Sequence, residues 1–298
     1  MRKALAAAAA VTIGLCGCSV KKQAIRSLGE SLSSRLSASF ATDNDPELVR
    51  AAVPFSLKLV ESLIAESPRD GNLLLSAAKG FTQYSYAFVQ EDADETQDRA
   101  AATALRARAT KLYLRARDYG MRGLELRRPN FAADLKADPK AAAARLDAKD
   151  VPLMYWTGLS WAGALSSSRD PFMLPQIPQF QALMDRALEL NESFDSGALH
   201  SFFIAFEMTS PTSHGDKAAR ARRHFERAVA LSGAHLGGPY VSYAENVMVA
   251  TKNRAGFEAE LKTALKIDVN ADPQYRLQNL IYQRRAKWLL ERTGQLFR

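Results

Sequence analysis

Apolar residues recur at helical spacing along almost the whole chain, and this periodicity constrains the fold more than any other feature of the sequence. They return every three or four positions, which places them on one face of an α-helix. β-Branched runs with period-two alternation, typical of strands, do not occur. The sequence therefore predicts an all-α fold. Turn-forming residues divide it into helices at about 46–66, 72–91, 97–127, 152–167, 177–191, 196–208, 217–232, 240–251, 254–267 and 273–293.

A recurring motif indicates that these helices form repeats. The segments "VESLIAESP", "GMRGLELRRP", "MDRALELNE", "FERAVALSG" and "LKTALKIDV" space small or apolar residues three apart before a polar turn. Ala221, Phe225 and Ala228 reproduce the small–aromatic–small spacing of a tetratricopeptide repeat, and the last two intervals approach its usual length of about 34 residues. We expect tetratricopeptide-like antiparallel helical repeats, an α-solenoid, with a degenerate N-terminal half. A generic helical bundle with coincidental spacing is the alternative.

The N-terminus has the pattern of a lipoprotein signal peptide. Arg2 and Lys3 precede an apolar run that is too short to span a bilayer, and "LCGCS" follows as a lipobox. Cleavage would leave Cys18 for lipidation, and Ser19 after it favours the periplasmic face of the outer membrane. An ordinary signal peptide with incidental cysteines is the alternative. We expect a signal peptide at 1–17, a lipid-anchored segment and helix at 18–45, and a helical-repeat domain at 46–298.

The segment after Cys18 carries its own apolar stripe in a Ser-rich background. Ile25, Leu28, Leu32 and Leu36 lie on one face of a helix, which we expect to pack the anchored end onto the body.

The net charge of the chain limits the classes of molecule that it is expected to bind. The formal net charge is +8, and the chain stays basic after removal of Arg2 and Lys3. In the periplasm a basic protein attracts anionic headgroups, an acidic protein or an anionic ligand, so nucleic acid is not expected.

Sequence motifs of catalysis and metal binding are absent. The chain has no glycine-rich phosphate loop, no HExxH or paired-cysteine spacing and no GxSxG. We expect its four histidines to be structural or exposed, since nothing local brings them together at a metal. The acidic run "QEDADETQD", residues 90–98, lacks the oxygen spacing of a calcium loop, so we interpret it as a solvated turn between helices. We expect no enzyme activity, no cofactor and no metal.

A basic stripe on the helix at 97–127 is the candidate docking site. Offsets of three, four and seven place its members on one face: Arg108, Lys111, Arg115 and Arg122. A second basic helix contains Arg220, Arg222, Arg223 and Arg227. A solvated face is the alternative for both.

Aromatic residues gather in three helices that have little polar surface. "MYWTGLSWAGAL", residues 154–165, has no charge on any side, and "GFTQYSYAFVQ" and "ALHSFFIAFEM" resemble it. Core packing explains such helices, but Tyr and Trp carry polar tips that also suit an apolar ligand cavity. The candidate ligand- or pore-lining residues are Phe81, Tyr84, Phe88, Tyr155, Trp156, Phe202 and Phe206. Trp161 points away from Trp156, so we expect it in the core.

These stretches also carry a family resemblance. The lipobox, the segment from "ATDNDPELVRAAVPF" to "QEDADE", then "MYWTGLSWAGAL", "HFERAVALS" and "LQNLIYQRRAKWLLER" resemble the T-component family of tripartite ATP-independent periplasmic (TRAP) transporters. The resemblance implies a non-catalytic lipoprotein of tetratricopeptide-like repeats. It also implies a homo-oligomer, such as a trimer, around a pore, a substrate-binding P-component as partner, and a hydrophobic or amphipathic anionic ligand. The prolines of "SSSRDPFMLPQIPQF", residues 166–180, depart from a continuous solenoid.

Two functional classes therefore remain open. One is a transport accessory that binds a P-component and handles a ligand. The other is a scaffold lipoprotein that tethers envelope-assembly proteins through repeat grooves, without ligand transport.

Overall fold

The computed structural model describes residues 38–168 and 170–298, and all regular elements within these ranges are helical. The all-α prediction is confirmed. The predicted signal peptide, Cys18 and the predicted stripe from Ile25 to Leu36 lie outside the described residues. None of the described helices is both long enough and apolar enough to cross a membrane.

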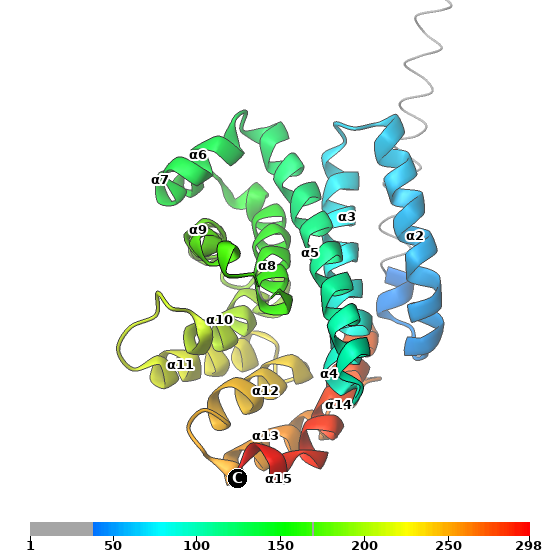
Figure 1. Cartoon of the computed structure of the whole chain (residues 1–298), viewed down its shortest axis with the longest axis vertical. Helices are drawn as coiled ribbons and strands as arrows, with labels where there is room; N and C mark the ends of the chain where they lie inside the picture. Colours follow the sequence, from blue (N-terminus) through cyan, green and yellow to red (C-terminus); the bar gives the residue numbers. More distant parts are fainter. Residues whose placement is uncertain (1–37, 169) are drawn as a thin grey trace, which may run out of the picture.

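Long antiparallel helices build the N-terminal half. They are α2 (Pro46–Glu66), α3 (Gly71–Tyr84), α5 (Arg99–Arg127) and α8 (Val151–Ser167), and α3 continues through a π-helical segment, η1 (Ser85–Gln90), into α4 (Glu91–Glu95). Asp45, Asp70 and Asp98 begin α2, α3 and α5 by accepting hydrogen bonds from first-turn N–H groups. Helix α2 packs on α3, and α5 packs between α3 and α8 (Figure 1).

Two short helices that the sequence pattern missed follow α5. They are α6 (Phe131–Ala137) and α7 (Pro139–Ala144), with the 3-10 turn η2 (Ala148–Asp150) after them. The sequence pattern predicted no helix between residues 127 and 152. Instead Asn130 adopts a left-handed conformation (φ 62°) and α6 begins at the next residue, because Phe131 and Leu135 are fully buried.

The C-terminal half consists of shorter helices that pack mainly on their neighbours in sequence. They are η3 (Pro171–Gln176), α9 (Ile177–Leu190), η4 (Phe194–Ser196), α10 (Ala198–Thr209), α11 (Lys217–Leu231), α12 (Gly237–Tyr243), η5 (Ala244–Met248), α13 (Arg254–Lys266), η6 (Pro273–Tyr275), α14 (Arg276–Glu291) and α15 (Thr293–Leu296). Pairs α10–α11, α12–α13 and α13–α14 are in contact, and α14 returns to α2 (Figure 1). Packing of each helix on its neighbours in sequence is consistent with a helical-repeat solenoid. The solenoid itself stays a prediction.

Helix α8 lacks a polar side because helices pack around it. It contacts α5, α3 and α9, and eleven of its residues are buried. Glycines bring the backbones close: a Cβ at Gly163 would lie 2.7 Å from the Tyr113 ring, and one at Gly120 would overlap the hydroxyl of Thr157. Burial on all sides therefore explains the uncharged sequence of 154–165 without a ligand cavity.

Candidate functional site

The predicted basic stripe lies on the solvent side of α5. All four members are exposed, and we call Arg108, Lys111, Arg115 and Arg122 the cationic row. Its arginines are seven positions apart, and each guanidinium lies over an aromatic ring. The ring centroids are those of Tyr84 at 5.8 Å from Arg108, Phe81 at 5.3 Å from Arg115 and Tyr119 at 5.3 Å from Arg122.

Glu61 of α2 fixes the middle of this surface. It accepts a 2.8 Å hydrogen bond from the Tyr119 hydroxyl, and its carboxylate lies 3.6 Å from Arg115. Burial works against the charge of Glu61, but hydrogen bonds from Lys58 and Tyr119 hold its pKa below the usual value. Burial and the hydrogen bond to Glu61 raise the pKa of Tyr119 to about 12. The ring under Arg122 is thus locked in place by α2.

The cationic row keeps most of its charge uncompensated. Among the described residues, no carboxylate lies within ion-pair distance of Arg108, Lys111 or Arg122. Cation–π contacts order an arginine side chain without neutralising it. The row therefore presents pre-positioned positive charge to an approaching molecule.

The second basic helix, α11, is different. Three of its arginines are paired with acids: Arg220 with Glu207, Arg222 with Glu226 and Arg227 with Glu192. This surface therefore carries much less net positive charge than α5.

The aromatic candidates are divided between two core clusters. Phe81, Tyr84 and Phe88 pack among α2, α3 and α5. Tyr155, Trp156, Phe202 and Phe206 belong to the cluster around α8, α9 and α10. Six of these seven side chains are at most 9% exposed, and Phe202 is half-buried. Trp156 and Trp161 are both 6% exposed, so the expected contrast between them does not exist in the single chain.

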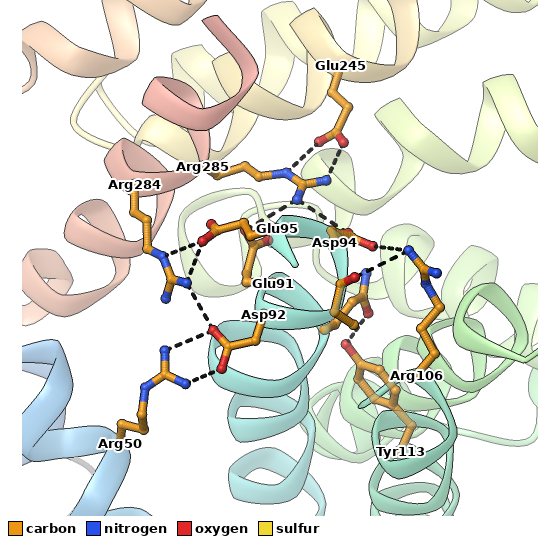
Figure 2. A network of polar contacts seen from close by, with 12 residues as sticks. Arg50, Glu91, Asp92, Asp94, Glu95, Arg106, Tyr113, Glu245, Arg284 and Arg285 are labelled. Carbon is orange, nitrogen blue, oxygen red and sulfur yellow. Dashed lines mark hydrogen bonds and ion pairs between the residues drawn. The ribbon is translucent and has the colours of Figure 1, made fainter. Parts of the chain in front are cut away.

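The acidic run at 90–98 is a solvated turn only at its end, where residues 97 and 98 are exposed and Asp98 begins α5. The interpretation was wrong for residues 91–95, which are helical and at least partly buried. The centre of the run is α4, whose carboxylates meet four arginines from three other helices (Figure 2). Arg50 pairs with Asp92, Arg106 with Asp94, and Arg284 with Asp92 at 2.9 Å and Glu95 at 2.6 Å. Arg285 reaches Asp94 at 3.3 Å and also pairs with Glu91 and Glu245. We call these residues the ionic cluster.

Glu91 and Arg285 form the buried centre of the ionic cluster. Burial opposes the charge of Arg285, but the carboxylates of Glu245 and Glu91 hold its pKa above the usual value. Burial raises the pKa of Glu91 to about 7, and the nearby carboxylates of Glu245, Asp94 and Glu95 add to the effect although Arg285 lowers it. The cluster contains more carboxylates than guanidinium groups, so its most buried carboxylate is the one that holds a proton most readily.

Two π-helical segments position this centre. Segment η1 ends at Gln90, directly before Glu91, and Glu245 belongs to η5. Each π-turn shifts the following side chains relative to a regular helix. Gln90 in turn accepts a 2.7 Å hydrogen bond from the Tyr113 hydroxyl of α5 (Figure 2). The only sequence signal for the cluster was charge complementarity between "EDADE" and the paired arginines in "LIYQRRAKWLL".

Two of the histidines meet through tertiary packing of α10 and α11, which no local sequence pattern indicated. Nδ1 of His200 lies 2.9 Å from Nδ1 of His224, and Nε2 of His200 lies 3.3 Å from Glu192. Burial lowers the pKa of His200, and burial with the neighbouring His200 lowers that of His224 to about 4. In the described part of the chain, no group of three or more His, Cys, Asp or Glu residues is arranged to hold a metal ion.

Comparison with known proteins gives two matches. The family model described as TRAP transporter T-component matches residues 42–297. An uncharacterized protein of Treponema pallidum (strain Nichols) is 29% identical over 306 aligned positions, which cover 94% of this chain and 93% of that protein.

Proposed function

Because the chain belongs to the TRAP transporter T-component family, we propose that it acts in the periplasm as a lipid-anchored partner of a substrate-binding P-component. The cationic row of α5 is the docking surface for an acidic face of that partner. The complex handles a hydrophobic or amphipathic anionic ligand, and the chain itself catalyses no reaction.

One observation carries the docking proposal. The arginines of the cationic row lie over aromatic rings, and no carboxylate of the described residues lies within ion-pair distance of Arg108 or Arg122. Charges of one sign on an exposed helix face steer an oppositely charged protein and raise its association rate. Ordering these side chains before binding also reduces the entropy lost on docking.

Ligand binding by the aromatic candidates requires a change from their arrangement in the single chain. The aromatic candidates are buried in helix packing, so a pore lined by them would need their faces to become exposed. We propose that such exposure accompanies assembly of several copies or docking of the P-component, where the ligand would pass between apolar surfaces.

Anchoring is proposed from the lipobox alone, since Cys18 lies outside the described residues. Cys18→Ala should leave an uncleaved or soluble protein that no longer floats with membranes in a density gradient. Unchanged flotation would contradict acylation at Cys18.

The docking proposal is tested with the detergent-solubilised full-length protein and the TRAP P-components of the same organism. Immobilised chain should bind at least one P-component in a salt-sensitive manner by interferometry. Absence of binding at low ionic strength to every P-component would contradict the proposal and would favour the scaffold alternative.

A further inference from the structure

Helix α2 lies at the edge of the molecule, on the outer side of α3 (Figure 1). It packs on the body through four buried residues, Val49, Leu57, Val60 and Ile64. A second face carries four apolar residues at offsets of three, four and four, which place them on one side of the helix: Leu48, Ala51, Phe55 and Leu59. We call them the apolar row. Leu48 is 59% exposed and Phe55 is 75% exposed.

The apolar row is continuous with the cationic row of α5. Lys58 is exposed one turn after Phe55 on α2, and its Nζ lies 2.6 Å from Oε2 of Glu61. The same carboxylate group of Glu61 lies 3.6 Å from Nη1 of Arg115 in the cationic row. This path of neighbouring side chains joins Phe55 to Arg115, so the two rows belong to one surface.

This surface has the composition of a protein interface. Exposed apolar residues that lie together mark contact sites, and an interface typically has an apolar, aromatic centre with a polar rim. Here the apolar row supplies the centre, and Lys58 with the cationic row supplies positive charge along one side. A partner whose carboxylates face the cationic row would therefore place the neighbouring part of its own surface over Phe55.

We infer that the apolar row is the second half of the surface that docks the P-component, with Phe55 as its main contact. This inference rests on the proposed docking role of the cationic row. The matching face of the P-component has an apolar patch that is bordered on one side by carboxylates.

The two rows act at different stages of binding. Charges act across about 8–10 Å of water at physiological ionic strength, so the cationic row changes the rate of encounter. An apolar contact forms only after water has left the interface, so Phe55 changes how long the complex lasts. The inference therefore predicts a dissociation-rate effect for Phe55 and an association-rate effect for the cationic row.

Dissociation of the P-component from the immobilised, detergent-solubilised full-length protein, followed by interferometry, tests the inference. Phe55→Ser should raise the dissociation rate at least about tenfold and change the association rate less than about twofold, because loss of a central aromatic contact acts after encounter. Phe172→Ser is the matched control, since Phe172 is 84% exposed on η3, which packs on α9. It should leave both rates unchanged. Both rings are largely in water, so neither variant should unfold at a lower temperature.

Photo-cross-linking identifies the molecule that covers Phe55. Phe55 is replaced by the photoreactive amino acid benzoylphenylalanine in the full chain, which is irradiated with the P-component. The expected product has the combined mass of the chain and the P-component, and the same replacement at Phe172 should not give it. A product that contains two copies of the chain, a product within one chain, or a lipid adduct in its place would overturn the inference.

Failure of the inference is distinct from failure of the proposed function. If the P-component binds in a salt-sensitive manner but dissociates from Phe55→Ser as it does from wild type, the inference is overturned and the cationic row docks the partner alone. Equal acceleration in Phe55→Ser and Phe172→Ser would also overturn it. If no P-component binds even at low ionic strength, the proposed function fails and the inference fails with it.

Discussion

Arg285 of α14 lies against Glu91 of α4, with Nη1 of the guanidinium 3.4 Å from Oε2 of the carboxylate and 194 positions between them in sequence. Their side chains are 8% and 2% exposed. The pair joins the C-terminal helices to the N-terminal ones, and π-helical segments deliver both Glu91 and the second partner of Arg285, Glu245. Contacts this distant in sequence fix how the two halves of the protein meet.

Arg285→Ala should lower the free energy of unfolding by about 3–5 kcal/mol, because it leaves buried carboxylates without their partner. Urea denaturation monitored by circular dichroism measures the loss. Arg254→Ala removes an exposed ion pair with Glu258 on α13 and should cost no more than about 0.5 kcal/mol. Equal losses in the two variants would show that the ionic cluster does not hold the halves together.

Protonation of Glu91 should stabilise the fold. Its pKa rises from the ordinary 4.5 to about 7 on folding, so the folded state binds this proton more tightly than the unfolded state. This contribution is fully present below about pH 4.5 and is lost as pH rises through 7. Glu91→Gln keeps the neutral form at every pH.

The free energy of unfolding of Glu91→Gln, relative to wild type, should therefore increase by up to about 3 kcal/mol between pH 4.5 and 7.5. Urea titrations of both proteins across this range measure the difference, in which other titrating groups cancel. A difference that is constant with pH would contradict the raised pKa.

Gly120→Ala should destabilise the contact between α5 and α8. The added Cβ would overlap the hydroxyl of Thr157 and lie 3.1 Å from its Cβ. Overpacking of this kind costs about 1–3 kcal/mol, more than the roughly 1 kcal/mol gained from the higher helix propensity of Ala. Gly294→Ala, with nothing within 4 Å of the new Cβ, is the control and should be neutral or stabilising. A thermal melt in which the two variants behave alike would rule out close helix contact at Gly120.

Local sequence predicted the long helices well and the polar centre poorly. The bounds of α2 agree with the prediction at both ends, because a capping residue and a regular spacing of apolar residues together specify such a helix. Helices α6 and α7 were missed because their few buried residues, such as Phe131 and Leu135, show too little periodicity. The ionic cluster was missed because Arg284 and Arg285 become partners of α4 only through tertiary packing.

The cationic row was predicted correctly as an exposed face, since its spacing alone places four basic residues together. The rings beneath it come from α3 and from α5 itself, and no periodicity reveals that they support the arginines. For the aromatic candidates, the apolar sequence around them indicates burial. Their division between two core clusters depends on the fold and has no signal in the sequence.

Trp156→Ala and Trp161→Ala should destabilise the protein to a similar degree, about 3–5 kcal/mol each, because both side chains are 6% exposed. Unfolding of the purified single chain measures this. Trp161 also donates a 2.8 Å hydrogen bond to Gln176, so the loss of stability in Trp161→Ala should be at the upper end of this range. A much smaller loss of stability for Trp156→Ala, together with loss of binding of an apolar fluorescent probe, would instead place Trp156 on a ligand cavity.

The association rate of the P-component, measured by stopped flow as a function of ionic strength, tests the proposed docking role most directly. Reversing Arg108, Lys111 and Arg115 to Glu should slow association at low salt about tenfold or more and flatten its salt dependence. Reversing Arg222, Arg223 and Lys262, which are exposed on α11 and α13, changes the net charge equally and should have a much smaller effect. If both triple variants associate at the same rate and with the same salt dependence, the cationic row does not dock the P-component.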